Sequence, residues 1–112
     1  MIMEFNCSIQ FKTNTNRGGG DGVVCFENGE FIIISKGVAA RVLFGAIGAA
    51  LAKGKEVMRF RTDDIASYKA YRKMLAYYIT LTLKDGGTLT FNYPKKIEDE
   101  LLPIFASVPQ EQ

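Results

Sequence analysis

The sequence predicts a mainly β domain, α+β in content, in which a seven-stranded antiparallel barrel or sandwich ends in a helix. Residues 3–12 alternate apolar and polar side chains without a break, which is typical of a half-buried strand. Two hairpin patterns follow at 23–34 and 77–93, each with glycine in its turn. From residue 94 apolar side chains recur every three or four residues, which indicates a helix.

The length of 112 residues suits one domain, which we expect to span residues 1–112 with an apolar insertion at 37–55 and a frayed tail at about 109–112. Apolar residues make up 47% and charged residues 23%, the ordinary balance of a globular chain. The net charge of +2 does not by itself favour nucleic acid as a partner.

Charge is unevenly distributed along the chain. Residues 36–61 hold six Lys or Arg against one Glu, whereas residues 85–112 hold two Lys against five acids. The basic segment surrounds an apolar run, so it suggests either contact with an anionic surface or a solvated rim.

The first strand predicts a core face and leads into a loop. Met3, Phe5, Cys7, Ile9 and Phe11 share the apolar face of residues 3–12. Residues 13–22 contain polar turn formers and three consecutive glycines, so we expect a flexible loop there.

The first hairpin turns at Asn28-Gly29, a strong signal for a two-residue type I′ turn. The predicted pairs are Phe26 with Phe31, Cys25 with Ile32, Val24 with Ile33 and Val23 with Ile34. Both faces of this hairpin are apolar, so something must cover the second one, and the following segment is the nearest candidate.

Two short strands are predicted at 56–61 and 63–72, with Asp63-Asp64 in the turn between them. The second hairpin is predicted to have a three-residue loop, Asp85-Gly86-Gly87, with glycine as its left-handed residue. The expected pairs are Leu83 with Leu89, Thr82 with Thr90, Leu81 with Phe91 and Ile79 with Tyr93.

The final helix buries the stripe of Ile97, Leu101, Phe105 and Val108. Pro94 can open this helix, and Pro103 is expected to kink or split it because proline lacks a backbone donor.

The segment between the third and fourth strands contains eleven consecutive apolar or small residues, 42–52. A helix of that length rises about 16 Å at about 1.5 Å per residue, too short for a hydrocarbon core of about 30 Å. We therefore expect a short Gly/Ala-rich helix that ends at Gly54 rather than a membrane span.

Four stretches resemble bacterial PH-like and GRAM-like domains of the pleckstrin-homology superfold, over roughly residues 22–107. In the order of the chain they are "VVCFENGEFIIIS", "VLFGAIGAALAKGK", "FRTDDIASYKAYR" and "YYITLTLKDGGTLTFNY", and the second stands between strands three and four. The resemblance implies a PH-like barrel with a C-terminal helix and a non-catalytic binding role.

The chain departs from eukaryotic PH domains in two ways. It has no tryptophan, which their C-terminal helix usually carries. Their phosphoinositide pattern of closely spaced basic residues on the first two strands is also absent, since only Lys12 and Arg17 fall in that region. The resemblance therefore does not imply recognition of inositol phosphates.

Most catalytic chemistry is disfavoured by the residue types. The chain has no histidine, so histidine-based triads, bases and metal sites are excluded. Cys7 and Cys25 form neither a disulfide framework nor a CxxC site, and Asp63 and Asp64 would point to opposite faces of a strand. We expect no enzyme activity, cofactor or metal. Because the start of the chain does not resemble a signal peptide, we expect a reduced, cytoplasmic protein.

Three binding functions remain. The first is self-association, or binding of a protein partner, through the segment 38–52. The candidate interface residues are Leu43, Phe44, Gly45, Ile47, Gly48 and Leu51, with glycines spaced for close helix packing.

The second function is peripheral membrane association at the cytoplasmic face. The candidate anionic-lipid contacts are Arg17, Arg41, Lys53 and Lys55, helped by Arg59 and Arg61. The third is an apolar ligand inside the barrel. Five tyrosines with interleaved basic residues are better explained by packing than by nucleic-acid stacking.

Overall fold

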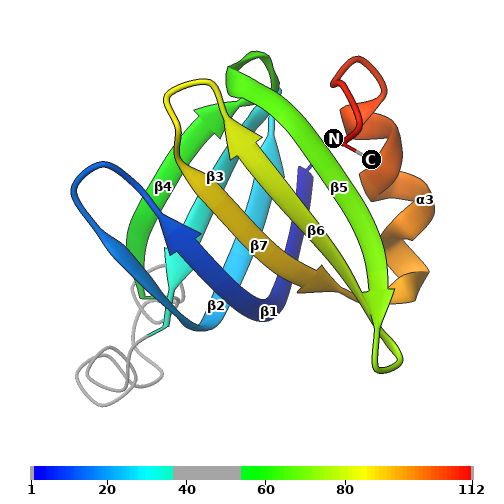
Figure 1. The fold of residues 1–112 in the computed structure, drawn as a ribbon. Coiled ribbons are helices and arrows are strands. Elements are labelled where there is room, and N and C mark those ends of the chain that lie inside the picture. The colour runs from blue at the N-terminus through cyan, green and yellow to red at the C-terminus, as the bar shows by residue number, and fades with distance from the viewer. Residues whose placement is uncertain (1, 37–53, 112) are drawn as a thin grey trace.

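The computed structural model describes residues 2–36 and 54–111, which form one seven-stranded antiparallel sheet closed by a C-terminal helical segment (Figure 1). The strands are β1 (Ile2–Lys12), β2 (Arg17–Glu27), β3 (Glu30–Ser35), β4 (Lys55–Arg61), β5 (Ile65–Lys73), β6 (Ala76–Leu83) and β7 (Thr88–Tyr93). The predicted fold class is confirmed. The expected Gly/Ala-rich helix lies outside the described residues.

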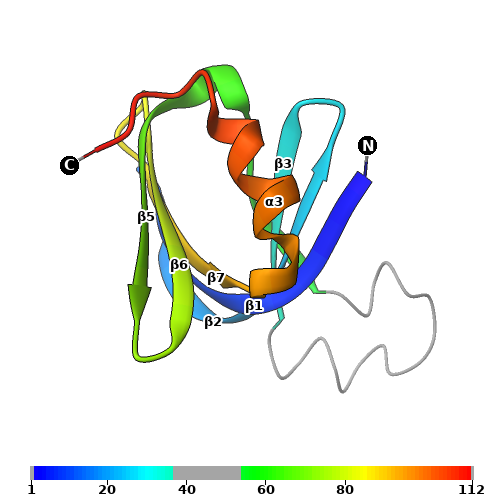
Figure 2. The same cartoon turned by 90° about the vertical axis from the view of Figure 1, so that its right-hand side faces the viewer.

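β1 joins the two halves of the sheet, whose order is β4-β3-β2-β1-β7-β6-β5. It pairs with β2 along its whole length and with β7 at residues 9–12. Within the described residues, β4 and β5 are therefore the two edges. Figure 2 shows the C-terminal helical segment lying in the opening between the two halves.

The glycine-rich stretch before Val23 is a strand, so the expectation of a flexible loop over residues 13–22 is wrong for residues 17–22, and only residues 13–16 connect β1 to β2 outside the strands. β2 begins at Arg17, and its glycines pair with β1, for example Gly22 with Cys7. A Cβ atom on Gly22 would lie 2.7 Å from the Ile34 carbonyl oxygen and 2.7 Å from Ile9 Cδ1. Here glycine permits close packing between strands and does not signal a loop.

The first hairpin has the predicted register, with Phe26 opposite Phe31 and Val24 opposite Ile33. Asn28 and Gly29 have φ values of 54° and 77°, as a type I′ turn requires. The inner face is buried, and on the outer face Val23 is buried too. Coverage of that outer face by the segment after it remains a prediction outside the described residues.

The second hairpin is shifted by two residues from the predicted register. Leu81 pairs with Leu89 and Ile79 with Phe91, and the three-residue loop is 84–86. Gly86 N–H donates to the Leu83 carbonyl at 3.0 Å, and Gly86 is the left-handed residue with φ 94°. Both registers keep the same side chains on each face, so alternation alone did not distinguish them.

The C-terminal helical segment is split at Pro103, as predicted. Its parts are η2 (Lys95–Ile97), α3 (Glu98–Leu101) and η3 (Leu102–Phe105). The tail up to Glu111 is not frayed, because Tyr68 N–H donates to the Pro109 carbonyl at 3.0 Å and Glu111 N–H donates to the Tyr68 carbonyl at 2.7 Å.

A column of aromatic rings crosses the opening of the sheet. Phe31 on β3 stacks on Phe60 of β4 at 5.3 Å between ring centroids, and on Phe105 at 5.7 Å. Phe105 in turn stacks on Tyr68 of β5 at 5.2 Å. The ring of Phe105 therefore connects the two edge strands that share no backbone pairing in the described part of the chain.

Phe105→Ala is expected to lower the free energy of unfolding by about 3–5 kcal/mol, because the side chain is fully buried and its loss leaves a cavity. Urea denaturation measures the change. Ser107→Ala, at an exposed position two residues later, serves as the control and should stay within about 0.5 kcal/mol of the wild type. Equal, small effects for both variants would contradict the bridging role of Phe105.

Candidate functional site

The tip of the β5–β6 hairpin exposes two large apolar side chains. Lys73 pairs with Ala76, so Met74 and Leu75 form a two-residue loop. Met74 is 89% exposed and Leu75 83% exposed, and these are the large hydrophobic side chains that stand open among the residues described. Exposed neighbouring apolar side chains of this size suggest an interaction site.

The backbone at this tip is unfavourable for the residues that occupy it. Met74 and Leu75 have φ values of 50° and 69°, in the left-handed region. That region costs a side chain with a Cβ atom about 1–2 kcal/mol, and type I′ turns prefer Asn-Gly for this reason. The β2–β3 turn of the same chain does use Asn28-Gly29. Met74 and Leu75 in the β5–β6 turn therefore lower the stability of the fold, and neither side chain is buried to compensate.

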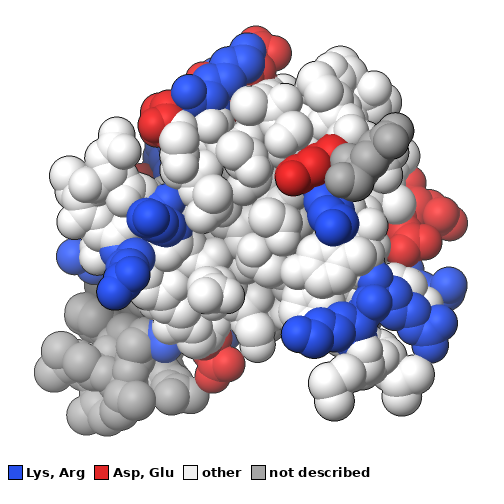
Figure 3. Space-filling model, viewed as in Figure 1, with Lys and Arg blue, Asp and Glu red and all other residues white. Residues whose placement is uncertain are grey.

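Four exposed basic side chains surround the tip: Arg72 and Lys73 at the end of β5, and Lys95 and Lys96 at the start of the C-terminal helical segment. None of them forms an ion pair with a residue in the described ranges. Figure 3 shows Lys and Arg gathered at the lower right, with uncharged atoms projecting below them. The tip thus combines a projecting apolar end with unneutralised positive charge.

Tyr77 connects the two pairs of basic residues. The Arg72 guanidinium carbon lies 5.6 Å and the Lys95 ammonium 5.3 Å from the centroid of its ring, within the range of cation–π attraction. Tyr77 also packs on Tyr93, with ring centroids 5.9 Å apart. The Tyr93 hydroxyl donates to Glu98 Oε2 at 3.0 Å, and burial together with this carboxylate raises the pKa of Tyr93. Tyr93 therefore stays a neutral donor, and its contact occupies Glu98.

Sequence reasoning missed this site. It ended one strand at residue 72 and began the next at 77, and it left the four residues "KMLA" between them without a role. The available signal was a hairpin connection with no Gly, Pro, Asn or Asp, which are the residues that tight turns favour.

The candidate interface residues from Leu43 to Leu51 lie outside the described residues, as do Arg41 and Lys53. Arg17 and Lys55 are exposed at the starts of β2 and β4. Arg17 and Lys55 belong to neither strand of the β5–β6 hairpin. The structure therefore does not place them in the same hairpin as the basic residues of the tip.

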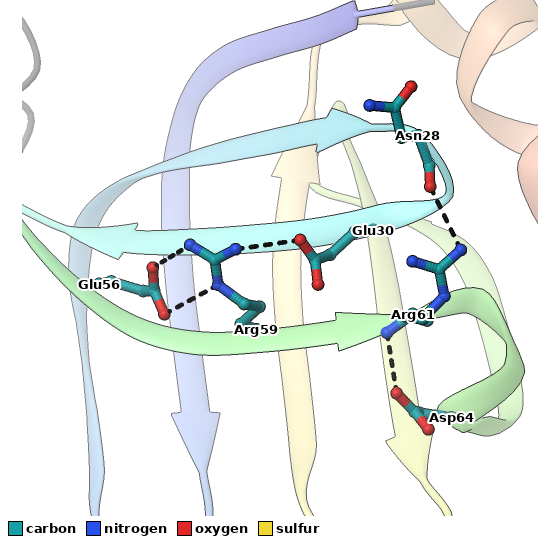
Figure 4. A network of polar contacts seen from close by, with 6 residues as sticks. All are labelled: Asn28, Glu30, Glu56, Arg59, Arg61 and Asp64. Atoms are coloured by element: carbon teal, nitrogen blue, oxygen red, sulfur yellow. Dashed lines mark hydrogen bonds and ion pairs between the residues drawn. The ribbon is translucent and has the colours of Figure 1, made fainter.

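Arg59 and Arg61, expected to help attract lipid, are engaged within the protein (Figure 4). Arg59 bonds to Glu56 at 2.8 and 3.2 Å and to Glu30 at 3.0 Å. The hydrogen bond to Arg59 lowers the pKa of Glu56, and the same bond raises the pKa of Arg59. The Arg61 guanidinium donates to the Asn28 carbonyl at 3.3 Å. The two carboxylates offset the charge of Arg59, and the carbonyl contact occupies part of the Arg61 guanidinium without neutralising it.

Other groups considered for chemistry have structural surroundings. Asp64 accepts a hydrogen bond from Arg61 N–H at 2.9 Å in the short turn η1 (Thr62–Asp64), and Tyr71 stacks on Tyr78 at 5.5 Å. The described residues contain no cluster of three or more side chains that could hold a metal ion. Within the same residues, no helix is long and apolar enough to cross a bilayer.

Comparison with known proteins identifies the fold. No protein-family model matches the chain, and no curated protein matches it in sequence. Among solved structures, the chain is similar to the pleckstrin homology domain of ArhGAP27, with a TM-score of 0.60 and 7% sequence identity. The match covers 93% of this chain and 96% of that one. At this identity the likeness shows the fold alone, which is PH-like, as the sequence resemblance implied.

The half-buried thiol of Cys7 should be unreactive in the folded protein. Burial raises its pKa to about 12, although Lys36 opposes the shift. At pH 8 the thiolate, which is the nucleophile, should be roughly 1,000-fold scarcer than for an exposed cysteine. In a Cys25→Ser variant, iodoacetamide should therefore label Cys7 far more slowly in the folded protein than in urea. Equal rates in both conditions would show that Cys7 is accessible and ionises normally.

Proposed function

We propose that this chain is a non-catalytic binding module that associates peripherally with anionic membranes through the tip of its β5–β6 hairpin. The observation that carries the proposal is the exposed Met74-Leu75 pair, held in the left-handed region and surrounded by basic side chains without ion-pair partners in the described residues. The proposal places the module at the cytoplasmic leaflet, which is rich in anionic lipid.

The two kinds of side chain at the tip suit the two layers of a membrane surface. Burying a Met or Leu side chain in an apolar environment is favourable by about 1.5–3 kcal/mol. Each Lys or Arg near an anionic surface adds about 1 kcal/mol. Since Arg72 and Lys73 directly precede Met74, the charges would lie at the headgroups when the apolar pair enters the lipid.

A rigid tip reduces the cost of binding. The tip closes a hairpin whose strands pair continuously from Tyr68 to Leu81 through Lys73 and Ala76. Its conformation is therefore set before it meets a membrane, and little conformational entropy remains to be lost.

Met74→Asn/Leu75→Gly tests the proposal without risk of unfolding. It installs the favoured type I′ pair and leaves the net charge unchanged, so the free energy of unfolding should rise by about 1–2 kcal/mol. Vesicle co-sedimentation should show that the wild type binds phosphatidylserine-containing vesicles and that this more stable variant binds them at least about tenfold more weakly.

A second variant is the matched control for apolar character at the tip. Met74→Leu keeps an apolar side chain at the tip and should bind like the wild type. If the Asn-Gly variant binds as tightly as the wild type, or the wild type fails to distinguish anionic from neutral vesicles, the proposed function is wrong.

Self-association through residues 38–52 remains a prediction from the sequence, which rests on the small residues Gly45 and Gly48. Size-exclusion chromatography with light scattering should detect a dimer or larger species at high concentration, and Leu43→Asp should dissociate it. A monomer at all concentrations would rule this prediction out.

A further inference from the structure

A hollow of about 420 Å³ lies beside the tip, at the end of the sheet where β6 begins and β7 ends. One wall is formed by Leu75 and Tyr77 of the β5–β6 hairpin, and another by Asn92 and Lys95 at the end of β7 and just beyond it. Asn6 of β1 also lines the hollow, as do Ala76, Tyr93 and Pro94. Leu75 belongs to both the tip and the hollow, so a membrane that receives the tip also meets the hollow.

The two asparagines of the hollow use their carboxamide oxygens in hydrogen bonds within the protein. Asn92 Oδ1 accepts the Ser8 N–H at 2.7 Å, and Asn6 Oδ1 accepts the Lys36 ammonium. These bonds orient both carboxamides, and neither NH₂ group has an acceptor among the described residues. Lys95 adds an ammonium group that forms no ion pair there.

Carboxylates do not line the hollow among the described residues. The acid nearest in sequence to Lys95 is Glu98, and its Oε2 already accepts the Tyr93 hydroxyl. A site with one ammonium, two amide donors and no acid suits an oxyanion, because charge-assisted hydrogen bonds to phosphate are strong.

We propose, resting on the membrane association above, that this hollow binds the phosphate of an anionic phospholipid headgroup. Lys95 and the NH₂ groups of Asn6 and Asn92 donate to the phosphate oxygens. Leu75 lies at the lipid side of the same hollow and contacts the glycerol and acyl portion. The module then recognises individual headgroups as well as the average charge of the surface.

Variants that each lower the net charge by one separate a site from diffuse attraction. Lys95→Gln and Asn92→Asp alter the hollow, and the aspartate keeps the oxygen that accepts the Ser8 N–H. Lys96→Gln and Gln10→Glu make the same charge change at exposed positions that do not line the hollow. Binding to phosphatidylcholine vesicles containing phosphatidylserine is measured for all four, with thermal unfolding to confirm the fold.

Lys96→Gln and Gln10→Glu should each weaken binding by no more than about fivefold, as expected for one diffuse charge. Lys95→Gln and Asn92→Asp should each lose at least about fivefold more than their controls. If all four variants weaken binding equally while the wild type still binds, the headgroup site is wrong and the membrane proposal stands. If the wild type does not bind these vesicles, both proposals fail.

A soluble probe distinguishes lipid from free phosphate. In NMR titrations, dihexanoyl phosphatidylserine below its micelle concentration should shift the side-chain NH₂ signals of Asn92 and Asn6 in a saturable way. Inorganic phosphate should shift them only weakly. Saturation by inorganic phosphate at equal or lower concentration would overturn the assignment to a lipid headgroup.

Discussion

The stacking of Phe105 between Phe31 and Tyr68 is the contact on which the arrangement of the whole domain depends. A sheet of seven strands leaves β4 and β5 as unpaired edges in the described residues, and no backbone hydrogen bonds hold these edges together. The side chains of the C-terminal helical segment fill the opening instead, with Leu101 and Phe105 fully buried. The chain after the helix then pairs with Tyr68 and holds β5 a second time.

Because β5 is held at Tyr68, the far end of the same strand projects as a defined hairpin. Its tip departs from the local preference that the chain follows elsewhere. Asn28-Gly29 satisfies the type I′ turn of the first hairpin, whereas Met74-Leu75 adopts the same backbone at a cost and buries nothing. This loss of stability is the reason for proposing that the segment is a binding element, and the basic residues around it are the reason for proposing an anionic surface.

Much of the fold followed from the sequence, because strand alternation and turn chemistry are local signals. The register of the Asn28-Gly29 hairpin and the split at Pro103 were both predictable for that reason. The glycines before Val23 led to the wrong prediction of a loop. Composition does not reveal that Gly22, which lacks a Cβ atom, lets Ile9 and Ile34 pack close to the backbone of β2. The site at the β5–β6 tip was not predicted, because the sequence does not show that Met74 and Leu75 are exposed. Nor does it show that Lys95 and Arg72 both lie against Tyr77 in the folded chain.

The central claim is that the β5–β6 tip enters the bilayer, and a single tryptophan can test it because the chain has none. Leu75→Trp places the reporter at the tip, and Thr15→Trp places it at the exposed β1–β2 turn. With anionic vesicles that contain lipids brominated on their acyl chains, the account predicts strong fluorescence quenching for Leu75→Trp and little for Thr15→Trp. A vesicle-bound Leu75→Trp protein whose fluorescence is not quenched would contradict it.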